Sequence, residues 1–470
     1  MDTTSIFENR TFDEIRIGDS ATLSRTIARE DIELYAAISG DANPVHVDDG
    51  LARASWIEGV TAQTLLPAGL VSNLLGNRLP GAGTVYRAHE LRFERAIVVG
   101  DTITATIKVR EKRAEGHVVI FDYSCVNQQG QTVITGTAEV MAPREKSRTS
   151  VHELGEVRVR RHAKYERLIH RARELPPVTT VVAHPCDETS LKGAVEAAEA
   201  GIIIPTLVGP EVKIRAVAEK AGLDISRFEI VPAEHSHAAA AKAVELVRAG
   251  RGELLMKGSL HTDELLHEVA AREGGLRTAR RISHVFILDV PTYSDALFIT
   301  DAAVNIAPDL DTKHDIVQNA IDLHHGLGLG APRVAILSAV ETVTSKIPGT
   351  IEAAALCKMA DRGQITGGFL DGPLALDNAI SPEAARIKGI KSEVAGRAQV
   401  LVVPDLEAGN MLAKNLSFLA EADAAGIVLG ARVPIILTSR ADSVRTRMAS
   451  CAIAALYTHS RHRSVGLASE

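Results

Sequence analysis

Aromatic side chains are scarce in this sequence: phenylalanine, tyrosine and tryptophan make up 3% of 470 residues, with one tryptophan. Proteins that bind single-stranded nucleic acid stack bases on exposed aromatic rings, and this chain has few rings to offer. Basic residues are not in excess either, because 52 lysines and arginines stand against 59 aspartates and glutamates, a net charge of −7. We therefore expect no nucleic-acid partner, no anionic membrane surface as a target, and a core of aliphatic side chains.

Cysteine is rare as well. The chain has four cysteines that are far apart and form no CxxC pair: Cys125, Cys186, Cys357 and Cys451. Disulfide frameworks and zinc sites need clustered cysteines, so we expect buried, reduced thiols in a cytoplasmic protein, and no metal. The sequence contains no run of about 18 apolar residues, so we expect no segment that spans a membrane. The acidic N-terminus lacks the apolar segment of a signal peptide.

The sequence pattern changes near residue 143. Alternation with period two in residues 102–109, and β-rich runs at 117–126 and 131–141, predict consecutive antiparallel strands. The apolar segment 61–75 before them has helical length. A helix followed by such a meander predicts an α+β domain over residues 10–142, with a sheet wrapped around one buried helix.

A linker is predicted at residues 143–164. It opens a basic stretch, residues 144–174, that we expect to continue as a solvated helix. A binding role for this stretch is the lesser alternative, because acidic residues are interspersed. From residue 177 onwards, buried-type strands alternate with helices, and glycines directly follow several of the helices. This alternation predicts an α/β domain of parallel βαβ units over residues 165–470.

A carboxylate and an imidazole are close together in the segment YAAISGDANPVHVD, residues 35–48. Gly40 ends a helix, and Asn43 and Pro44 set a turn, so Asp41 and His46 are predicted to converge on one point. A carboxylate and an imidazole that share a water form a general base and a general acid. The alternative is an Asx turn followed by a solvent-exposed histidine.

Residues 10–142 resemble the MaoC-like, R-specific enoyl-CoA hydratase family. The resemblance is carried by the segment from Tyr35 to Asp48 and by LPGAGTVY at residues 79–86. It implies a hot-dog fold, in which an antiparallel sheet wraps around a long central helix. It also implies that water adds across the double bond of a trans-2-enoyl-CoA to give an (R)-3-hydroxyacyl-CoA. Asp41 would activate the water, and His46 would handle the proton exchanged with the α-carbon.

The enolate that develops in this reaction needs hydrogen-bond donors, which the N-terminus of a helix supplies. The family often has His-Gly at this point, where this chain has Gln63-Thr64. The backbone N–H of Thr64 is retained, but its Cβ limits close approach. Ser72 matches a family serine that hydrogen-bonds near the catalytic pair, although its helical spacing fits an ordinary core hydroxyl equally well. Asn43 supports the turn between the two catalytic side chains.

Two strand–turn–helix junctions in the second part carry polar residues suited to an anion. The first contains Lys257 and Gly258, and the second contains Ser439 and Arg440. A hydroxyl, a guanidinium and backbone N–H groups suit a phosphate. Because every strand–helix turn carries capping groups, a purely structural turn is the alternative at both places. The glycine-rich run 326–330 precedes a strand instead of following one, so we expect no dinucleotide cofactor.

Residues 165–470 resemble the phosphate acetyltransferase/phosphate butyryltransferase family. The matching stretches are IIPTLVG (203–209), MKG (256–258), DAAVN (301–305), PRVAILS (332–338), FLDGPLALDNA (369–379) and TSRADS (438–443). The resemblance implies two α/β lobes and acyl transfer between CoA and orthophosphate, with Ser439 and Arg440 contacting the acyl phosphate. The acetyl branch has a carboxylate seven residues after that serine, where this chain has Thr446, as in the butyryl branch. Asp442 is the nearest substitute for the base.

Together the two resemblances imply a bifunctional enzyme of CoA thioesters with no permanently bound cofactor. Its substrates would be CoA thioesters and orthophosphate. Hot-dog domains bury a sheet edge or a helix face against a second copy, so we expect a homo-oligomer. Two alternatives stay open: a C-terminal domain that binds acyl-CoA without turnover and regulates the hydratase, and a hot-dog half that is purely structural.

Overall fold

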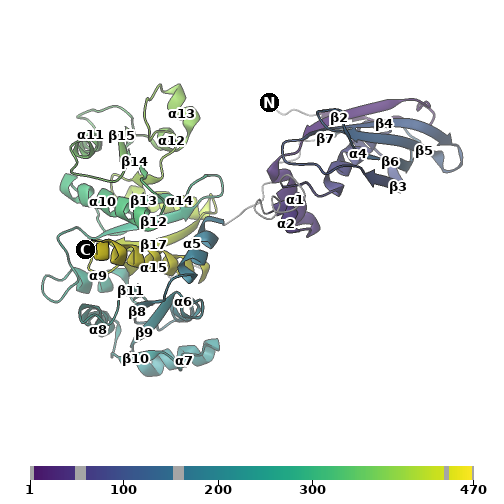
Figure 1. Ribbon diagram of the computed structural model, residues 1–470. Coiled ribbons are helices and arrows are strands. Elements are labelled where there is room, and N and C mark those ends of the chain that lie inside the picture. The colour runs from purple at the N-terminus through teal and green to yellow at the C-terminus, as the bar shows by residue number, and fades with distance from the viewer. Residues whose placement is uncertain (1–4, 48–59, 152–162, 439–443, 468–470) are drawn as a thin grey trace. The chain divides into compact units, whose positions relative to one another are not determined.

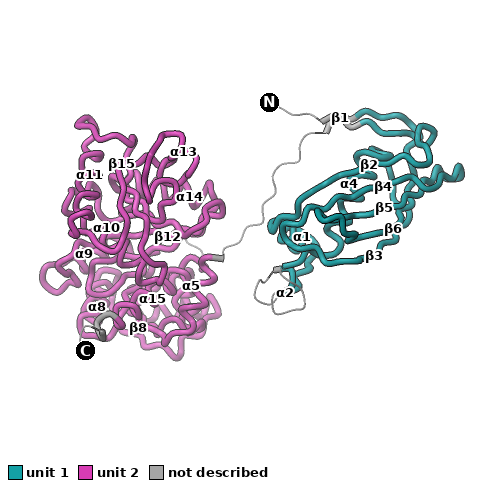
Figure 2. The backbone as a smooth tube through the Cα atoms, turned by 45° about the horizontal axis from the view of Figure 1, so that its top comes forward, with its two compact units in different colours: residues 1–160 teal, residues 161–470 magenta. Residues whose placement is uncertain are grey.

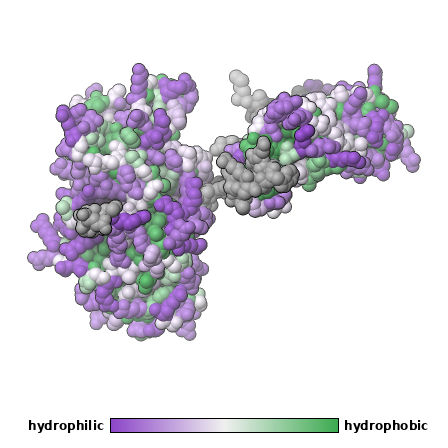
Figure 3. Space-filling model, in the orientation of Figure 1, coloured by the Kyte–Doolittle hydropathy of each residue, from purple (hydrophilic) through white to green (hydrophobic). Residues whose placement is uncertain are grey.

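The computed structural model describes residues 5–47, 60–151, 163–438 and 444–467. Clustering of backbone contacts divides the chain into two compact units, residues 1–160 and 161–470 (Figure 2). On the face drawn in Figure 3, hydrophilic side chains cover most of each unit, with hydrophobic residues interspersed. None of the described helices is long and apolar enough to cross a membrane.

The first unit is an antiparallel sheet wrapped around one helix (Figure 1). The sheet has the strand order β2–β4–β5–β6–β3, with bounds β2 (Ser20–Thr26), β3 (Val85–Phe93), β4 (Thr102–Arg113), β5 (Val118–Val126) and β6 (Thr132–Met141). The enclosed helix is α4 (Leu65–Asn77). This arrangement confirms the predicted hot-dog fold. A second pair, β1 (Ser5–Glu8) and β7 (Arg148–Val151), is antiparallel, and the 3-10 turn η1 (Glu115–His117) leads into β5.

Helix α4 forms the centre of this unit because its sequence, LLPAGLVSNLLGN, is apolar on most of its circumference. Val71, Leu74 and Leu75 are completely buried. They join one cluster with the inward-facing residues of the strands, such as Ile103, Ile107 and others at alternate positions. The opposite side of α4 stays open, since Leu65 is 53% exposed. The helix therefore supports the sheet with one face and offers the other to the surface.

The second unit is one mixed sheet of eleven strands with helices on both faces. Its order is β10–β9–β8–β11–β18–β17–β12–β13–β16–β14–β15. The strands are β8 (Val178–Ala183), β9 (Ile203–Gly209), β10 (Glu229–Pro232), β11 (Leu254–Lys257), β12 (Ser283–Asp289), β13 (Leu297–Thr300), β14 (Arg333–Leu337), β15 (Phe369–Leu374), β16 (Val400–Val402), β17 (Asp423–Leu429) and β18 (Ile435–Ile436). The helices are α5 (Ala163–Arg173), α6 (Glu188–Glu199), α7 (Glu211–Ala221), α8 (Ser236–Arg248), α9 (Thr262–Ala270), α10 (Leu310–Gly326), α11 (Pro348–Asp361), α12 (Leu376–Ile380), α13 (Pro382–Ile387), α14 (Leu406–Phe418) and α15 (Val444–Leu467).

Parallel pairing holds within two groups of strands but not between them. Strands β10, β9, β8, β11 and β18 are parallel to their neighbours, and so are β13, β16, β14 and β15. The groups are joined through β17 and β12, which pair antiparallel with each other and with the strands beside them. The prediction of parallel βαβ units is thus right within each group and wrong at the joint. The two groups are the two lobes of this unit.

The hydrophobic core also distinguishes the lobes. On one face, a single cluster runs under α5, α6, α10 and α15, together with α7 and α11. On the other face there are two separate clusters, one under α8 and α9 and one under α12 to α14. The lobes therefore share one core and have separate cores on the opposite face.

The chain crosses between the lobes before β12 and again before β18, and these two crossings are bonded to each other. Arg277 and Ala431 form an isolated antiparallel bridge. The Arg432 N–H donates to the Leu276 carbonyl at 2.8 Å. The Thr278 hydroxyl donates to the Gly430 carbonyl at 2.6 Å.

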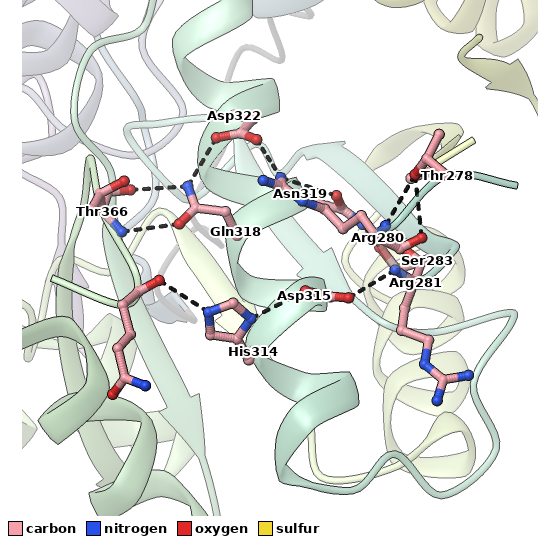
Figure 4. A network of polar contacts seen from close by, with 12 residues as sticks. Thr278, Arg280, Arg281, Ser283, His314, Asp315, Gln318, Asn319, Asp322 and Thr366 are labelled. Atoms are coloured by element: carbon pink, nitrogen blue, oxygen red, sulfur yellow. Dashed lines mark hydrogen bonds and ion pairs between the residues drawn. The ribbon is translucent and has the colours of Figure 1, made fainter. Parts of the chain in front are cut away.

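Helix α10 fixes the first crossing through a polar network (Figure 4). The Arg281 N–H donates to Asp315 at 2.8 Å. Asn319 donates from Nδ2 to the Arg281 carbonyl at 3.0 Å and to Ser283 Oγ at 2.8 Å. Asn319 is 3% exposed whereas Arg281 is exposed, so this network runs from the interior of the unit to its surface.

All four cysteines are free thiols, as predicted: Cys125, Cys186 and Cys451 are buried and Cys357 is half-buried. Burial raises the pKa of Cys125 and Cys186 to about 11. It also raises the pKa of Cys357 and Cys451 to about 12. These thiols are therefore protonated at neutral pH.

Candidate active sites

Two short helices position the carboxylate and the imidazole of the first unit. Helix α1 (Arg29–Ser39) ends at Gly40, whose φ of 76° is left-handed and turns the chain sharply. Asp41 follows the turn, and α2 (Pro44–Val47) carries His46. The Asn43 side chain accepts a hydrogen bond from the Val45 N–H at 3.3 Å, which caps α2. The Asx turn foreseen as an alternative is therefore present, but it serves to place the histidine.

The structure brings Asp41 and His46 together. Asp41 Oδ2 lies 3.8 Å from His46 Nε2, and the two side chains are 48% and 12% exposed. The histidine is thus largely buried rather than solvent-exposed, while the carboxylate faces the surface. A separation of 3.8 Å is too long for a direct hydrogen bond, and it suits a bridging water or a substrate oxygen.

A backbone carbonyl fixes the imidazole. His46 Nδ1 lies 2.8 Å from the Thr61 carbonyl oxygen. A carbonyl only accepts hydrogen bonds, so the proton of the neutral ring is on Nδ1 and the lone pair on Nε2 faces Asp41. This state suits a group that accepts a proton at Nε2.

Gln63 fixes the backbone of Asp41. Its side chain is buried, and Nε2 donates to the Ile32 carbonyl at 3.2 Å and to the Asp41 carbonyl at 3.3 Å. It therefore connects α1 to the residue that carries the carboxylate. Sequence reasoning noted Gln63 only as a departure from a family pattern and missed Thr61 altogether. The nearer contact of Thr61 is its backbone carbonyl, for which a sequence contains no signal, and its hydroxyl lies 3.3 Å from His46 Nδ1.

Thr64 and Ser72 lie on the open side of α4. Thr64 is exposed at the N-terminus of the helix. The backbone N–H groups of the first turn therefore begin directly after Gln63, the residue that bonds to the Asp41 carbonyl. Ser72 is exposed two turns later. An ordinary core hydroxyl would be buried, so that alternative does not hold for Ser72.

A hollow of about 430 Å³ runs along this open side of α4. It is lined by Leu65, Ala68, Gly69 and Ser72 of α4 and by Tyr86, Arg87, Ala88, His89 and Leu91 of β3. Burial raises the pKa of Tyr86, and the Ser72 hydroxyl partly opposes that shift. Burial lowers the pKa of His89, whose Nε2 lies 2.6 Å from the Tyr123 hydroxyl. The hollow begins one residue after Thr64 and is mostly apolar, so it could hold an acyl chain.

In the second unit, Lys257 and Gly258 form a tightly packed turn after β11. Lys257 is 4% exposed, and its Nζ donates to the carbonyls of Gly258 at 3.2 Å and Leu260 at 3.0 Å. A Cβ on Gly258 would lie 2.4 Å from the carbonyl oxygens of Ala183 and His184, so only glycine fits. Lys257 thus stabilises its own turn, and its role in binding phosphate stays a prediction.

The two junctions singled out in the sequence are neighbours in the sheet. Strands β11 and β18 are parallel, with Leu255 beside Ile435 and Met256 beside Ile436. Continuing this register places Gly258 beside Thr438 at the carboxyl end of both strands. Ser439, Arg440 and Asp442 lie outside the described residues, so the structure gives no account of them. Thr446, on α15, is 8% exposed.

The glycine-rich run set aside in the sequence is a turn, and the two histidines before it, at the end of α10, contact backbone carbonyls. The glycine-rich run begins where α10 ends and leads into β14, so it is not at the N-terminus of a helix. His324 Nδ1 lies 2.8 Å from the Gly330 carbonyl, and His325 Nε2 lies 2.6 Å from the Gly367 carbonyl. Within the described ranges, no three histidine, cysteine, aspartate or glutamate side chains are placed to hold a metal ion.

Both units match known families. Residues 233–455 match the family described as "Phosphate acetyl/butaryl transferase", and residues 16–124 match "MaoC like domain". A phosphate acetyltransferase from Rhizobium meliloti is 75% identical over 299 residues, which cover 64% of this chain and 95% of the relative.

Two solved structures are also similar. A branched-chain phosphotransacylase from Enterococcus faecalis superimposes with a TM-score of 0.53 and 31% identity, covering 60% of this chain and 99% of that chain. The R-hydratase PhaJ1 from Pseudomonas aeruginosa is 35% identical, covering 33% of this chain and 99% of that chain, with a TM-score of 0.32.

The contact between His46 and Thr61 predicts a single tautomer. We expect neutral His46 to be protonated on Nδ1, with unprotonated Nε2, because only that form donates to the Thr61 carbonyl. Long-range proton–nitrogen NMR spectra of protein labelled with ¹⁵N-histidine, assigned with His46→Gln, will measure this at pH 8. A dominant Nε2-protonated signal for His46 would contradict the geometry.

Proposed function

Because the chain belongs to the phosphate acetyl/butyryl transferase family and carries a MaoC-like domain, we propose that it is a bifunctional enzyme of CoA thioesters. The first unit hydrates a trans-2-enoyl-CoA to an (R)-3-hydroxyacyl-CoA. The second transfers an acyl group between CoA and orthophosphate. The observation that carries the hydratase assignment is the Asp41–His46 pair, with Nε2 aimed at the carboxylate across 3.8 Å.

Hydration at this pair requires both side chains. Asp41 accepts a proton from water as the water oxygen bonds to the β-carbon, and the electrons of the double bond move toward the thioester oxygen. Protonated His46 then gives its Nε2 proton to the α-carbon. In dehydration, neutral Nε2 takes the α-proton, and protonated Asp41 gives its proton to the leaving hydroxyl. After hydration, the proton that Asp41 took from water returns to His46 Nε2 across the 3.8 Å between the two groups, which restores both for the next turnover.

The N-terminus of α4 stabilises the negative charge that develops on the thioester oxygen. Backbone N–H groups from Thr64 onwards are the donors, and the helix dipole favours the enolate. The acyl chain occupies the apolar hollow beside Leu65 and Leu91, with Ser72 at its wall. Asn43 supports the pair through its cap on α2.

Removing either acid–base group is expected to lower the hydration rate by about 10²–10⁴-fold. Asp41→Asn cannot accept the proton of water, and His46→Gln cannot exchange the α-proton. The rate is followed by the loss of enoyl-thioester absorbance, with CoA thioesters of two to six carbons beyond the thioester carbonyl. Asp122→Asn, which changes an exposed carboxylate on the outer face of the sheet, is the matched control.

Retention of more than a tenth of the wild-type rate in Asp41→Asn would rule out this role for the carboxylate. No hydration by the wild-type protein would leave the first unit as a purely structural hot-dog domain.

Two findings support the transferase assignment. The chain is 75% identical to a phosphate acetyltransferase over 299 residues, and the two polar junctions follow neighbouring parallel strands, β11 and β18. The CoA thiolate attacks the carbonyl carbon of the acyl phosphate, the bond from that carbon to the bridging oxygen breaks, and orthophosphate leaves with the electron pair. Ser439 and Arg440 contact the acyl phosphate. Asp442 takes the thiol proton, since Thr446 has no carboxylate. The name of the similar enzyme favours acetyl-CoA as the substrate.

Loss of the guanidinium is expected to abolish transfer. Arg440→Ala should lower kcat/KM for orthophosphate by at least 100-fold, because a charge-assisted pair with the phosphate is lost. The reaction is started with acetyl-CoA and orthophosphate, and free CoA thiol is measured. Arg227→Ala, on an exposed loop of the same unit, is the control. Tight binding of acetyl-CoA by the wild-type protein without any release of thiol would favour the regulatory alternative instead.

We also propose a homo-oligomer held through the first unit. Strand β3 is at the edge of its sheet and is exposed along most of its nine residues, including Val85, Tyr86 and Phe93. A long, exposed, partly hydrophobic edge strand favours pairing with another strand. We place a second copy of β3 there. A cytoplasmic location agrees with the four free thiols.

Light scattering after size-exclusion chromatography is expected to give at least twice the mass of one chain. Phe93→Lys should shift the protein toward monomers, because it replaces an exposed apolar side chain of the edge strand with a charge. Val99→Lys changes an exposed residue of the same unit outside β3 and should leave the mass unchanged. A monomeric wild-type protein would exclude this assembly.

A further inference from the structure

Arg447 is the largest of the fully buried side chains in the described residues. It lies near the start of α15, at 2% exposure. Arginine is almost never fully buried unless its charge has a specific use, because desolvation of a guanidinium is costly. The hydration and acyl-transfer roles assigned above do not use this residue.

The guanidinium contacts the end of β18. Arg447 Nη1 donates to Thr438 Oγ1 at 2.7 Å, and Thr438 is itself 3% exposed. Thr438 directly precedes Ser439 in the chain. The register of β18 with β11 places it beside Gly258. Arg447 therefore holds the residue from which the proposed acyl-phosphate-binding segment begins.

Helix α6 makes room for this arginine. A Cβ on Gly193 would lie 2.8 Å from Arg447 Cδ and 3.2 Å from its Cβ. Glycine inside a helix is destabilising relative to alanine. Its presence in the middle of α6 is explained by this contact, which confines the Arg447 stem between α6 and the end of β18.

We propose that Arg447 is a positioning residue of the transferase: it holds Thr438 at the end of β18, and Thr438 directly precedes the proposed phosphate-binding pair in the chain. The inference rests on the proposed transferase function. The permanent charge of Arg447 lies within hydrogen-bond distance of Thr438, next in sequence to the residues assigned to a phosphate dianion. We therefore expect its loss to affect the KM for orthophosphate more than the KM for acetyl-CoA.

Thr438 allows a test that leaves the arginine in place. Thr438→Val removes the acceptor with almost no change in shape, whereas Thr438→Ser keeps the hydroxyl. We expect Thr438→Val and Arg447→Met to raise the orthophosphate KM at least tenfold, and Thr438→Ser to stay within twofold of the wild type. Amide hydrogen exchange in peptides covering residues 437–446 should be faster in the first two variants only.

Lys313→Met controls for the general cost of losing a buried cation. Lys313 is 5% exposed and pairs with Glu352 in the other lobe, between α10 and α11. Lys313→Met should lower the melting temperature without changing the orthophosphate KM or the rate of amide hydrogen exchange in residues 437–446.

The outcomes separate the two proposals. If Thr438→Val and Arg447→Met lower the melting temperature but keep the wild-type KM and exchange rates, Arg447 is merely structural and the inference is overturned. If the wild-type protein releases no CoA from acetyl-CoA and orthophosphate, the proposed transferase function fails instead. In that case the exchange rates alone decide whether Arg447 orders the segment.

Discussion

The antiparallel pairing of β12 with β17 is the constraint on which the second unit depends. Seven residue pairs, from Ser283–Leu429 to Asp289–Asp423, join two groups of parallel strands that run in opposite directions. Ligands of parallel sheets bind at the carboxyl ends of strands, and here those ends lie on opposite edges in the two lobes. The polar junctions after β11 and β18 belong to the same lobe and meet at one edge. In a sheet that was parallel throughout, the carboxyl ends of all strands would lie on the same side, and the two lobes would not differ in this way.

Sequence alone predicted the features that depend on neighbouring residues. The strands around residues 102–109, 117–126 and 131–141 were predicted because one of their faces is buried and their pattern alternates. Asp41 and His46 were predicted to converge because only a turn separates them, and the structure places them together. The direction of β12 could not be predicted, since a hydrophobic run such as SHVFILD looks the same in a parallel or an antiparallel pair.

Contacts between distant parts of the chain carry little signal in one sequence. The adjacency of β11 and β18 depends on strand order, which neither junction encodes. Thr61 acts through a carbonyl that every residue has, and Arg447 resembles any other arginine of a helix until its burial is known. Thr61 is 15 residues from His46 and Arg447 is nine residues from Thr438, so neither contact follows from adjacent positions in the chain. The proximity of Asp41 and His46 was therefore predicted from the sequence, and the contacts that Thr61 and Arg447 make were not.

The protonated state of the four cysteines has a consequence for a protein whose product is a free thiol. Disulfide exchange proceeds through thiolates, and with pKa values of about 11 to 12 roughly one cysteine in ten thousand or fewer is ionised at pH 7. CoA released at the proposed transferase site would thus meet almost no ionised cysteine of this chain. Oxidised CoA would form mixed disulfides with these buried or half-buried thiols only slowly, so the enzyme should resist inactivation by cysteine modification.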